Sequence, residues 1–246
     1  MSADAPFTLI PPAPGARTSL LFLCDHASNA VPADYDNLGL ARRSFETHIA
    51  YDIGAATVTR ALAAAYGAAA VLGRWSRLLI DLNRGADDPT LVMKLSDGSL
   101  IPGNRSADAA EVPRRIADFH APYHAAIARE LDRIGPAGTI LSFHSFTPAW
   151  KGKPRPWEVG VLWDQDGRLA RPLMARLAEA GFSVGDNEPY SGALEGDTLN
   201  LHGTQRGLPH VLIEMRQDLI GDDARAQAFA AKLKPVLDAA LADMER

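Results

Sequence analysis

Cysteine is nearly absent from this sequence: Cys24 is the only one among 246 residues. One cysteine cannot form an internal disulfide, and such a composition is typical of proteins from a reducing compartment. Near the N-terminus, the apolar run Leu20 to Leu23 is too short for the hydrophobic region of a signal peptide and far too short to span a membrane. The net charge of -5 shows no excess of basic residues that would indicate nucleic-acid binding. We therefore expect a cytoplasmic protein with neither nucleic acid nor membrane among its partners.

The remaining composition is that of an ordinary globular protein, with 47% hydrophobic and 22% charged residues. A chain of this length can bury a sizeable core. Neither a repeat nor a low-complexity segment divides it. We therefore predict a single catalytic domain over residues 1–246.

Short apolar runs alternate with longer amphipathic segments along the chain. The runs that predict strands are residues 19–24, 68–73, 77–83, 138–144, 158–164 and 210–216. The segments with helical spacing are residues 46–67, 111–135, 167–181 and 222–246, and Gly67, Gly135 and Gly181 are expected near the helix C-termini. This alternation predicts a three-layer α/β fold with a mixed, mostly parallel open sheet flanked by helices. Residues 85–113 have no clear period and are expected to form an excursion near the site.

Four of the apolar runs lead into or contain residues that can bind a metal or take part in catalysis. The first ends at His26, the third at Asn83 and Arg84, the fourth at His144, and the last contains Glu214. Ligands of open α/β sheets bind beyond the carboxyl ends of the strands, so these side chains are expected to meet. A carboxylate such as Glu214 inside an apolar strand needs a partner, a metal or a raised pKa.

Two histidines at separate strand ends favour a zinc site, and we expect His26 and His144 to be ligands. A catalytic zinc usually has a third protein ligand. Asn29 is a neutral amide and a poor candidate, whereas Asp52 is an acid on the predicted small-residue face of helix 46–67. The alternative for Asp52 is an acid favoured by the dipole at a helix N-terminus.

Further basic residues lie in less informative surroundings. His120 and His124 are one helical turn apart, but no glutamate stands between them as in zinc proteases, so we expect them to pack structurally. His202 and Arg206 stand in a glycine-bounded loop before the last strand, where they are candidates for an anion clamp.

Six segments carry a family resemblance. In order they are "CDHASNAVP", "HIAYDIGA", "DLNRG", "HSFTP", "NEPYSG" and "RGLPHVLIEMRQDLI", between residues 20 and 220. Together they resemble the N-formylglutamate amidohydrolase family, which is distantly similar to the zinc carboxypeptidases. The resemblance implies a phosphorylase/hydrolase-like fold, with His26 and His144 as zinc ligands and Glu214 as the catalytic carboxylate. Asn83 and Arg84 match a pair that grips a substrate carboxylate. Asn29 departs from the carboxypeptidases, which have a glutamate there.

The expected function is that of a zinc-dependent amidohydrolase acting on a small anionic amide, with N-formylglutamate, cleaved to glutamate and formate, as the substrate that the resemblance implies. Glu214 would act as general base and acid. Arg77 or Arg74 would stabilise the oxyanion. A dianionic substrate requires a second cation besides Arg84, for which Arg206 and Arg216 are the candidates; they would bind it together with Asn83 and His202.

Three alternatives remain open from the sequence. The chain could be a metallocarboxypeptidase-like peptidase, a deacylase for another N-acyl amino acid, or a metal-free binding module on the same fold. For Glu214, the alternative to catalysis is a buried ion pair with Arg216, which is two residues away on the same face of a strand.

Overall fold

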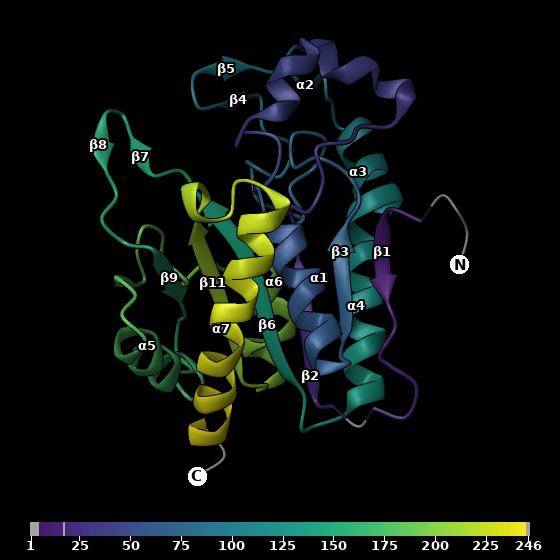
Figure 1. The fold of residues 1–246 in the computed structure, drawn as a ribbon. Helices are drawn as coiled ribbons and strands as arrows, with labels where there is room; N and C mark the ends of the chain where they lie inside the picture. The colour runs from purple at the N-terminus through teal and green to yellow at the C-terminus, as the bar shows by residue number, and fades with distance from the viewer. Residues whose placement is uncertain (1–4, 17, 245–246) are drawn as a thin grey trace.

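A mixed sheet forms the centre of the molecule (Figure 1) in the computed structural model, which describes residues 5–16 and 18–244. Within these residues the sheet has seven strands in the order β1-β3-β2-β6-β11-β9-β10. The strands are β1 Phe7–Ile10, β2 Leu20–Cys24, β3 Ala69–Gly73, β6 Thr139–Phe146, β9 Val159–Leu162, β10 Val184–Asp186 and β11 His210–Arg216. The four neighbouring strands β3, β2, β6 and β11 are parallel to one another. β1 is antiparallel to β3, and β9 is antiparallel to β11 but parallel to β10.

Helices cover both faces of this sheet, as predicted (Figure 1). On one face lie α1 Ala55–Tyr66, α5 Ala170–Glu179 and α7 Asp223–Met244, and both α1 and α5 pack against α7. The other face is covered by α4 Ala121–Ile134, accompanied by α2 Pro102–Arg105, α3 Glu111–Arg115 and α6 Thr198–His202. Strand β2 alternates between the two cores: Phe22 belongs to the first, and Leu21 and Leu23 to the second. Burial on both faces explains why these strands are continuous apolar runs.

Five of the six predicted strands are present, but the strand prediction for residues 77–83 is wrong. This segment is buried and forms turns instead. Buried side chains satisfy its backbone in place of a strand ladder: Asn104 Nδ2 donates to the carbonyl of Leu78, and Arg115 Nη1 donates to that of Leu79, at 2.8 and 2.7 Å. Apolar content predicts burial here, but it cannot distinguish a buried strand from a buried loop.

The helix predicted over residues 46–67 begins only at Ala55, so the placement of Asp52 on a helical face is wrong. Gly54 precedes the helix with φ of 81°, a left-handed conformation that ends any helical continuation from residue 46. A Cβ atom at Gly54 would lie 2.1 Å from the carbonyl oxygen of Ile220. Asp52 instead stands in a turn, where its backbone N–H donates to the carbonyl of His26 at 3.0 Å.

The other helices agree with the predictions. The segment 111–135 is α3, a π-helical turn over Ile116–His120 and α4 in direct succession. The predicted last helix is α7, although residues 245 and 246 lie outside the described part. Gly67 and Gly135 cap α1 and α4 with positive φ, and Gly181 follows α5 in the same way. No helix in the described ranges is long and apolar enough to cross a membrane.

The segment 85–113 contains a short hairpin and α2, ahead of α3. The hairpin pairs β4 Leu95–Ser96 with β5 Ser99–Leu100. A second hairpin, β7 Ala149–Trp150 with β8 Lys153–Pro154, follows β6. Both hairpins project from the same end of the molecule in Figure 1. That end is where the carboxyl ends of β2 and β6 lie.

Candidate metal centre

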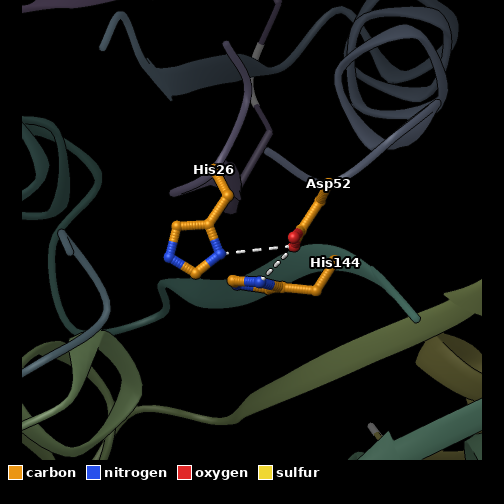
Figure 2. A group of neighbouring side chains, drawn as sticks. All are labelled: His26, Asp52 and His144. Carbon is orange, nitrogen blue, oxygen red and sulfur yellow. Dashed lines mark hydrogen bonds and ion pairs between the residues drawn. The ribbon is translucent and has the colours of Figure 1, made fainter. Parts of the chain in front are cut away.

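His26, Asp52 and His144 come together at the carboxyl ends of the central strands (Figure 2). His26 follows β2, His144 lies on β6, and Asp52 lies in the turn before α1. One potential ligand atom from each residue lies within 4.8 Å of the other two. Asp52 Oδ2 is 3.3 Å from His26 Nδ1 and 2.8 Å from His144 Nδ1. All three side chains are buried, so the two imidazoles present their Nδ1 atoms to one enclosed point.

The second nitrogen of each imidazole is held by another buried carboxylate. His26 Nε2 donates to Asp81 Oδ1 at 2.7 Å, and His144 Nε2 donates to Asp25 Oδ2 at 2.8 Å. A carboxylate behind a histidine fixes the ring orientation and the tautomer, and makes the other nitrogen a better ligand. Both rings are therefore arranged to offer Nδ1 to a metal.

Asp25 and Asp81 are themselves fixed by further donors. Asp25 accepts hydrogen bonds from the side chains of Tyr123, Ser142 and Thr198. Asp81 accepts a hydrogen bond from Arg77 Nη2 at 2.7 Å. Burial alone would raise the pKa of both acids, but the donors, with His144 foremost for Asp25 and Arg77 for Asp81, hold each pKa below its usual value. Both carboxylates thus stay ionised behind the imidazoles.

The charge of this cluster suits a divalent cation. Arg77 lies 3.8 Å from Asp52 Oδ1 and 2.7 Å from Asp81 Oδ2, so one guanidinium offsets part of the charge of the three buried carboxylates Asp25, Asp52 and Asp81. With neutral imidazoles the cluster carries two negative charges. Burial would lower the pKa of His144, but the adjacent Asp25 and Asp52 raise it well above its ordinary value, which reflects the same excess of negative charge. Two imidazole nitrogens and one carboxylate oxygen form a donor set typical of catalytic zinc.

Glu214 lies beside this cluster and has no cationic partner within the described residues. It is aligned with His144 between the parallel strands β11 and β6. Its Oε2 atom is buried and has no hydrogen-bond partner in the described ranges. Burial raises the pKa of Glu214 to about 7, despite the opposing effect of His144. The alternative ion pair is not formed, because Arg216 Nε donates to Asp218 Oδ1 at 2.8 Å.

A cavity of about 320 Å³ opens over these groups. Its lining includes the three clustered residues, Glu214 and Arg77, together with Asn83 and Arg84. The hairpin over residues 95–100 contributes Ser96, which agrees with the expected excursion near the site.

Asn83 and Arg84 present polar groups to this cavity. Asn83 is fixed by the backbone N–H of Thr198, which donates to its Oδ1 at 3.2 Å. Arg84 donates to the Asn83 carbonyl at 2.9 Å and to Thr90 Oγ1 at 3.3 Å. No carboxylate pairs with Arg84 in the part of the chain that the structure describes. Its guanidinium is therefore available to a ligand anion.

The predicted anion clamp at His202 is not brought into the cavity lining. His202 instead joins His120 and His124 in a buried chain, with His124 Nδ1 3.0 Å from His202 Nε2. His120 Nε2 donates to the carbonyl of Arg84, and His124 Nε2 lies 3.1 Å from that of Leu82. Burial lowers the pKa of His124 to about 3 and that of His202 to about 4. These neutral rings support the backbone of the segment that carries Asn83.

The remaining residues that the sequence suggested for substrate binding, oxyanion stabilisation or metal binding lie outside the cavity lining or the candidate metal cluster. Arg206 pairs with Asp132 at 2.7 Å and is not part of the cavity lining. Arg74 and Arg216 likewise do not line it. Asn29 donates to a backbone carbonyl, that of Phe45, and lies outside the candidate metal cluster.

Sequence reasoning missed the role of two acids, Asp25 and Asp81. Asp81 stands in the apolar run "LLIDLN", the same signal that marked Glu214. Asp25 stands directly before His26, and its partner His144 is 119 positions away. The cost of burying an unpaired carboxylate could have marked Asp81, but not which imidazole it holds.

An open α/β sheet with buried polar groups at the carboxyl ends of its strands has the arrangement in which such folds bind their ligands. The chain belongs to the N-formylglutamate amidohydrolase family, whose model matches residues 18–221. This confirms the resemblance found in the sequence segments. No curated protein sequence matches the chain.

Two solved structures share the fold of this chain. The gene product Atu2144 from Agrobacterium tumefaciens is 33% identical, with a TM-score of 0.91 over 98% of this chain and 96% of that chain. N-formylglutamate amidohydrolase from Ralstonia eutropha is 24% identical, with a TM-score of 0.69 over 98% of this chain and 97% of that chain, and shares the fold. A metallo-carboxypeptidase from Pseudomonas aeruginosa is a weaker match, 13% identical with a TM-score of 0.46 over 97% of this chain and 61% of that chain.

Proposed function

We propose that this protein is a metal-dependent hydrolase that cleaves the amide bond of an N-acyl amino acid. The observation that carries the proposal is the pair of imidazoles, His26 and His144, each tied at Nε2 to a buried carboxylate and directed at Asp52 through Nδ1. These three residues would hold a divalent cation, with zinc favoured by the donor set. Zinc supplies Lewis acidity that polarises the amide carbonyl and makes water a better nucleophile near neutral pH.

Glu214 is the proposed general base and acid. Its carboxylate lines the same cavity as His26, Asp52 and His144, and its Oε2 has no partner among the described residues. A carboxyl group with a pKa of about 7 can accept a proton from water and return it to the leaving amine. The unpaired state of Glu214 leaves this proton transfer unobstructed.

Arg77 is the proposed stabiliser of the oxyanion. Its guanidinium lines the cavity and is fixed by Asp81 at 2.7 Å, with Asp52 nearby at 3.8 Å. A cation that is held in place before the reaction stabilises developing negative charge without reorganisation.

Asn83 and Arg84 are proposed to bind the carboxylate of the substrate. Arg84 lines the cavity without a carboxylate partner in the described ranges, and its planar guanidinium can bind a carboxylate through two parallel hydrogen bonds. Arg84→Lys would keep the charge and lose that geometry, so KM should rise much more than kcat falls.

The formyl derivatives of amino acids are the first substrates to test, since the family is named after N-formylglutamate. Purified protein would be stripped with a chelator and assayed for formate release, alone and after addition of zinc at one equivalent. The proposal expects activity to be lost on stripping and to return with zinc. His144→Ala should not recover, whereas the exposed control Glu179→Gln should recover fully. Equal formate release by the stripped and zinc-loaded protein would overturn the metal dependence.

A further inference from the structure

The lining of the cavity holds fewer free cations than a substrate with two carboxylates needs. Apart from imidazoles, the basic side chains among the described residues that line it are Arg77 and Arg84. Arg77 lies 2.7 Å from Asp81 and 3.8 Å from Asp52, so its charge is already offset. Arg84 is proposed to bind one substrate carboxylate. An N-acyl amino acid with an acidic side chain therefore needs a further cation beside the cavity.

Arg155 is an arginine that packs against three aromatic side chains of the cavity wall. Its Cζ atom lies 5.7 Å from the ring centre of Phe146, 5.5 Å from that of Trp150 and 5.2 Å from that of Tyr190. All three aromatic residues line the cavity. Phe146 is buried, whereas Trp150 and Tyr190 are 40% and 45% exposed. The guanidinium is therefore next to the part of the cavity wall that reaches the surface.

The charge of Arg155 is not neutralised by an acid in the part of the chain that the structure describes. Its Nη1 atom donates to the carbonyl and the hydroxyl oxygen of Thr147, at 3.3 and 3.0 Å. None of its nitrogens is a buried atom without a hydrogen-bond partner. Its neighbours are thus aromatic rings and neutral oxygens, which leave its positive charge in place. A guanidinium of this kind can bind a carboxylate through two parallel hydrogen bonds.

The phenol of Tyr190 connects Arg155 with the proposed reaction centre. Burial raises the pKa of Tyr190, the Glu214 carboxylate raises it further, and the charge and a hydrogen bond of Arg155 oppose the rise. The phenol is thus within electrostatic reach of both the proposed general base and this arginine. Arg155 directly follows the β7–β8 hairpin, whereas Arg84 precedes the β4–β5 hairpin. Two separate segments therefore bring one arginine each to the site.

We propose that Arg155 binds the side-chain carboxylate of the substrate, so that the protein prefers N-acyl amino acids with an acidic side chain. This inference rests on the proposed function of the same site. Arg84 binds the α-carboxylate and Arg155 binds the second carboxylate, so the two arginines together recognise a dianion. Arg206 and Arg216, which the sequence suggested for this role, are paired with acids elsewhere.

N-formylglutamate and N-formylglutamine test this inference, because they have nearly the same shape and differ in the charge at the side-chain end. We expect the zinc-loaded protein at pH 8 to prefer the glutamate derivative at least about tenfold in kcat/KM, and Arg155→Gln to lower that preference by about the same factor, mainly through KM. Arg155→Lys keeps the charge but loses the planar fork, so it should retain part of the preference. Arg129→Gln removes an exposed arginine of α4 outside the cavity lining, and this matched control should keep the full preference.

The ratio of the two substrates separates recognition by Arg155 from a structural role. Arg155 also ties the segment after the β7–β8 hairpin to Thr147, and loss of that tie would lower the turnover of both substrates alike. Formate release from both substrates without a preference for N-formylglutamate, or with a preference that Arg155→Gln leaves unchanged, would overturn the role of Arg155 and leave the proposed function standing. Release from neither substrate by the zinc-loaded protein would overturn the proposed function, and this inference with it.

Discussion

Glu214→Gln should make the metal-free protein more stable while it abolishes most of the activity. The carboxyl group of Glu214 has a pKa of about 7 in the fold, against an ordinary value of 4.5. Above pH 7, ionised Glu214 therefore costs the folded state at most about 3 kcal/mol. Gln removes this charge with little change in shape, although its amide must find hydrogen bonds of its own.

The pH dependence gives the sign of this effect. A carboxylate with a raised pKa in the fold costs nothing below about pH 4.5, where it is protonated in both the folded and the unfolded chain. The cost grows as the pH rises towards 7 and is constant above that value. The variant should therefore gain stability relative to the parent at pH 8, and the gain should shrink towards pH 5.

Thermal unfolding of the chelator-treated proteins measures this difference. For a chain of this size, about 3 kcal/mol corresponds to a rise in Tm of roughly 6–12 °C at pH 8. A bound cation favours the ionised carboxylate, so zinc should reduce the difference. Formate release by the zinc-loaded variant should fall by roughly 10²–10⁴-fold, the usual scale for a general acid or base.

Glu179→Gln is the matched control on the exposed side of α5, and it should change neither measurement. A metal-free Glu214→Gln protein that melts below its parent at pH 8 would refute the electrostatic argument. A zinc-loaded variant with near-normal turnover would refute the catalytic role.

Three further predictions concern the metal ligands and the turn that positions one of them. His144→Ala should lose most bound zinc, measured by metal analysis of the folded variant, and full zinc occupancy would contradict the assignment. Asp52→Asn should weaken zinc binding by more than the roughly 10–100-fold that is typical when a residue hydrogen-bonded to a metal ligand is replaced. Asn29→Ala should leave the zinc dissociation constant nearly unchanged. The reverse ranking of the two dissociation constants would assign the role of third ligand to Asn29. Gly54→Ala should lower the free energy of unfolding by at least about 1–3 kcal/mol, because φ is 81° and the new Cβ would lie 2.1 Å from the Ile220 carbonyl oxygen. Denaturant unfolding measures this change, and an unchanged free energy of unfolding would contradict the prediction.

The sequence predicted the residues whose positions depend on strand ends. His144 and Glu214 follow from buried runs, because parallel strands bring such ends to one edge of the sheet. Asp52 joins the cluster although its predicted helix was wrong, since a turn held by Gly54 delivers it instead. Sequence patterns do not show such a turn, because it depends on a contact with the distant Ile220.

The long basic side chains were the least predictable part of the site. Arg206 and Arg216 stand near chemically relevant segments in the sequence, but each pairs with an exposed acid, Asp132 or Asp218. A flexible side chain several bonds long can reach in many directions, so its place in the chain does not determine what it contacts. The roles of Asp25 and Asp81 could not be predicted from the sequence for a related reason: they depend on which imidazole nitrogen each carboxylate contacts in the folded chain.

Asp25 and His26 are adjacent in the sequence, but their side chains form hydrogen bonds with two different partners. Asp25 holds His144 on β6, while its neighbour His26 is held by Asp81. If β2 slipped by one residue against β3 and β6, the acid and the imidazole would exchange places and both bonds would be lost. The hydrogen bonds of Asp25 and His26 thus stabilise the native register of β2 over a register shifted by one residue. The His–Asp–His cluster therefore requires the native register of β2, and a chain with β2 misaligned would lack a competent metal site.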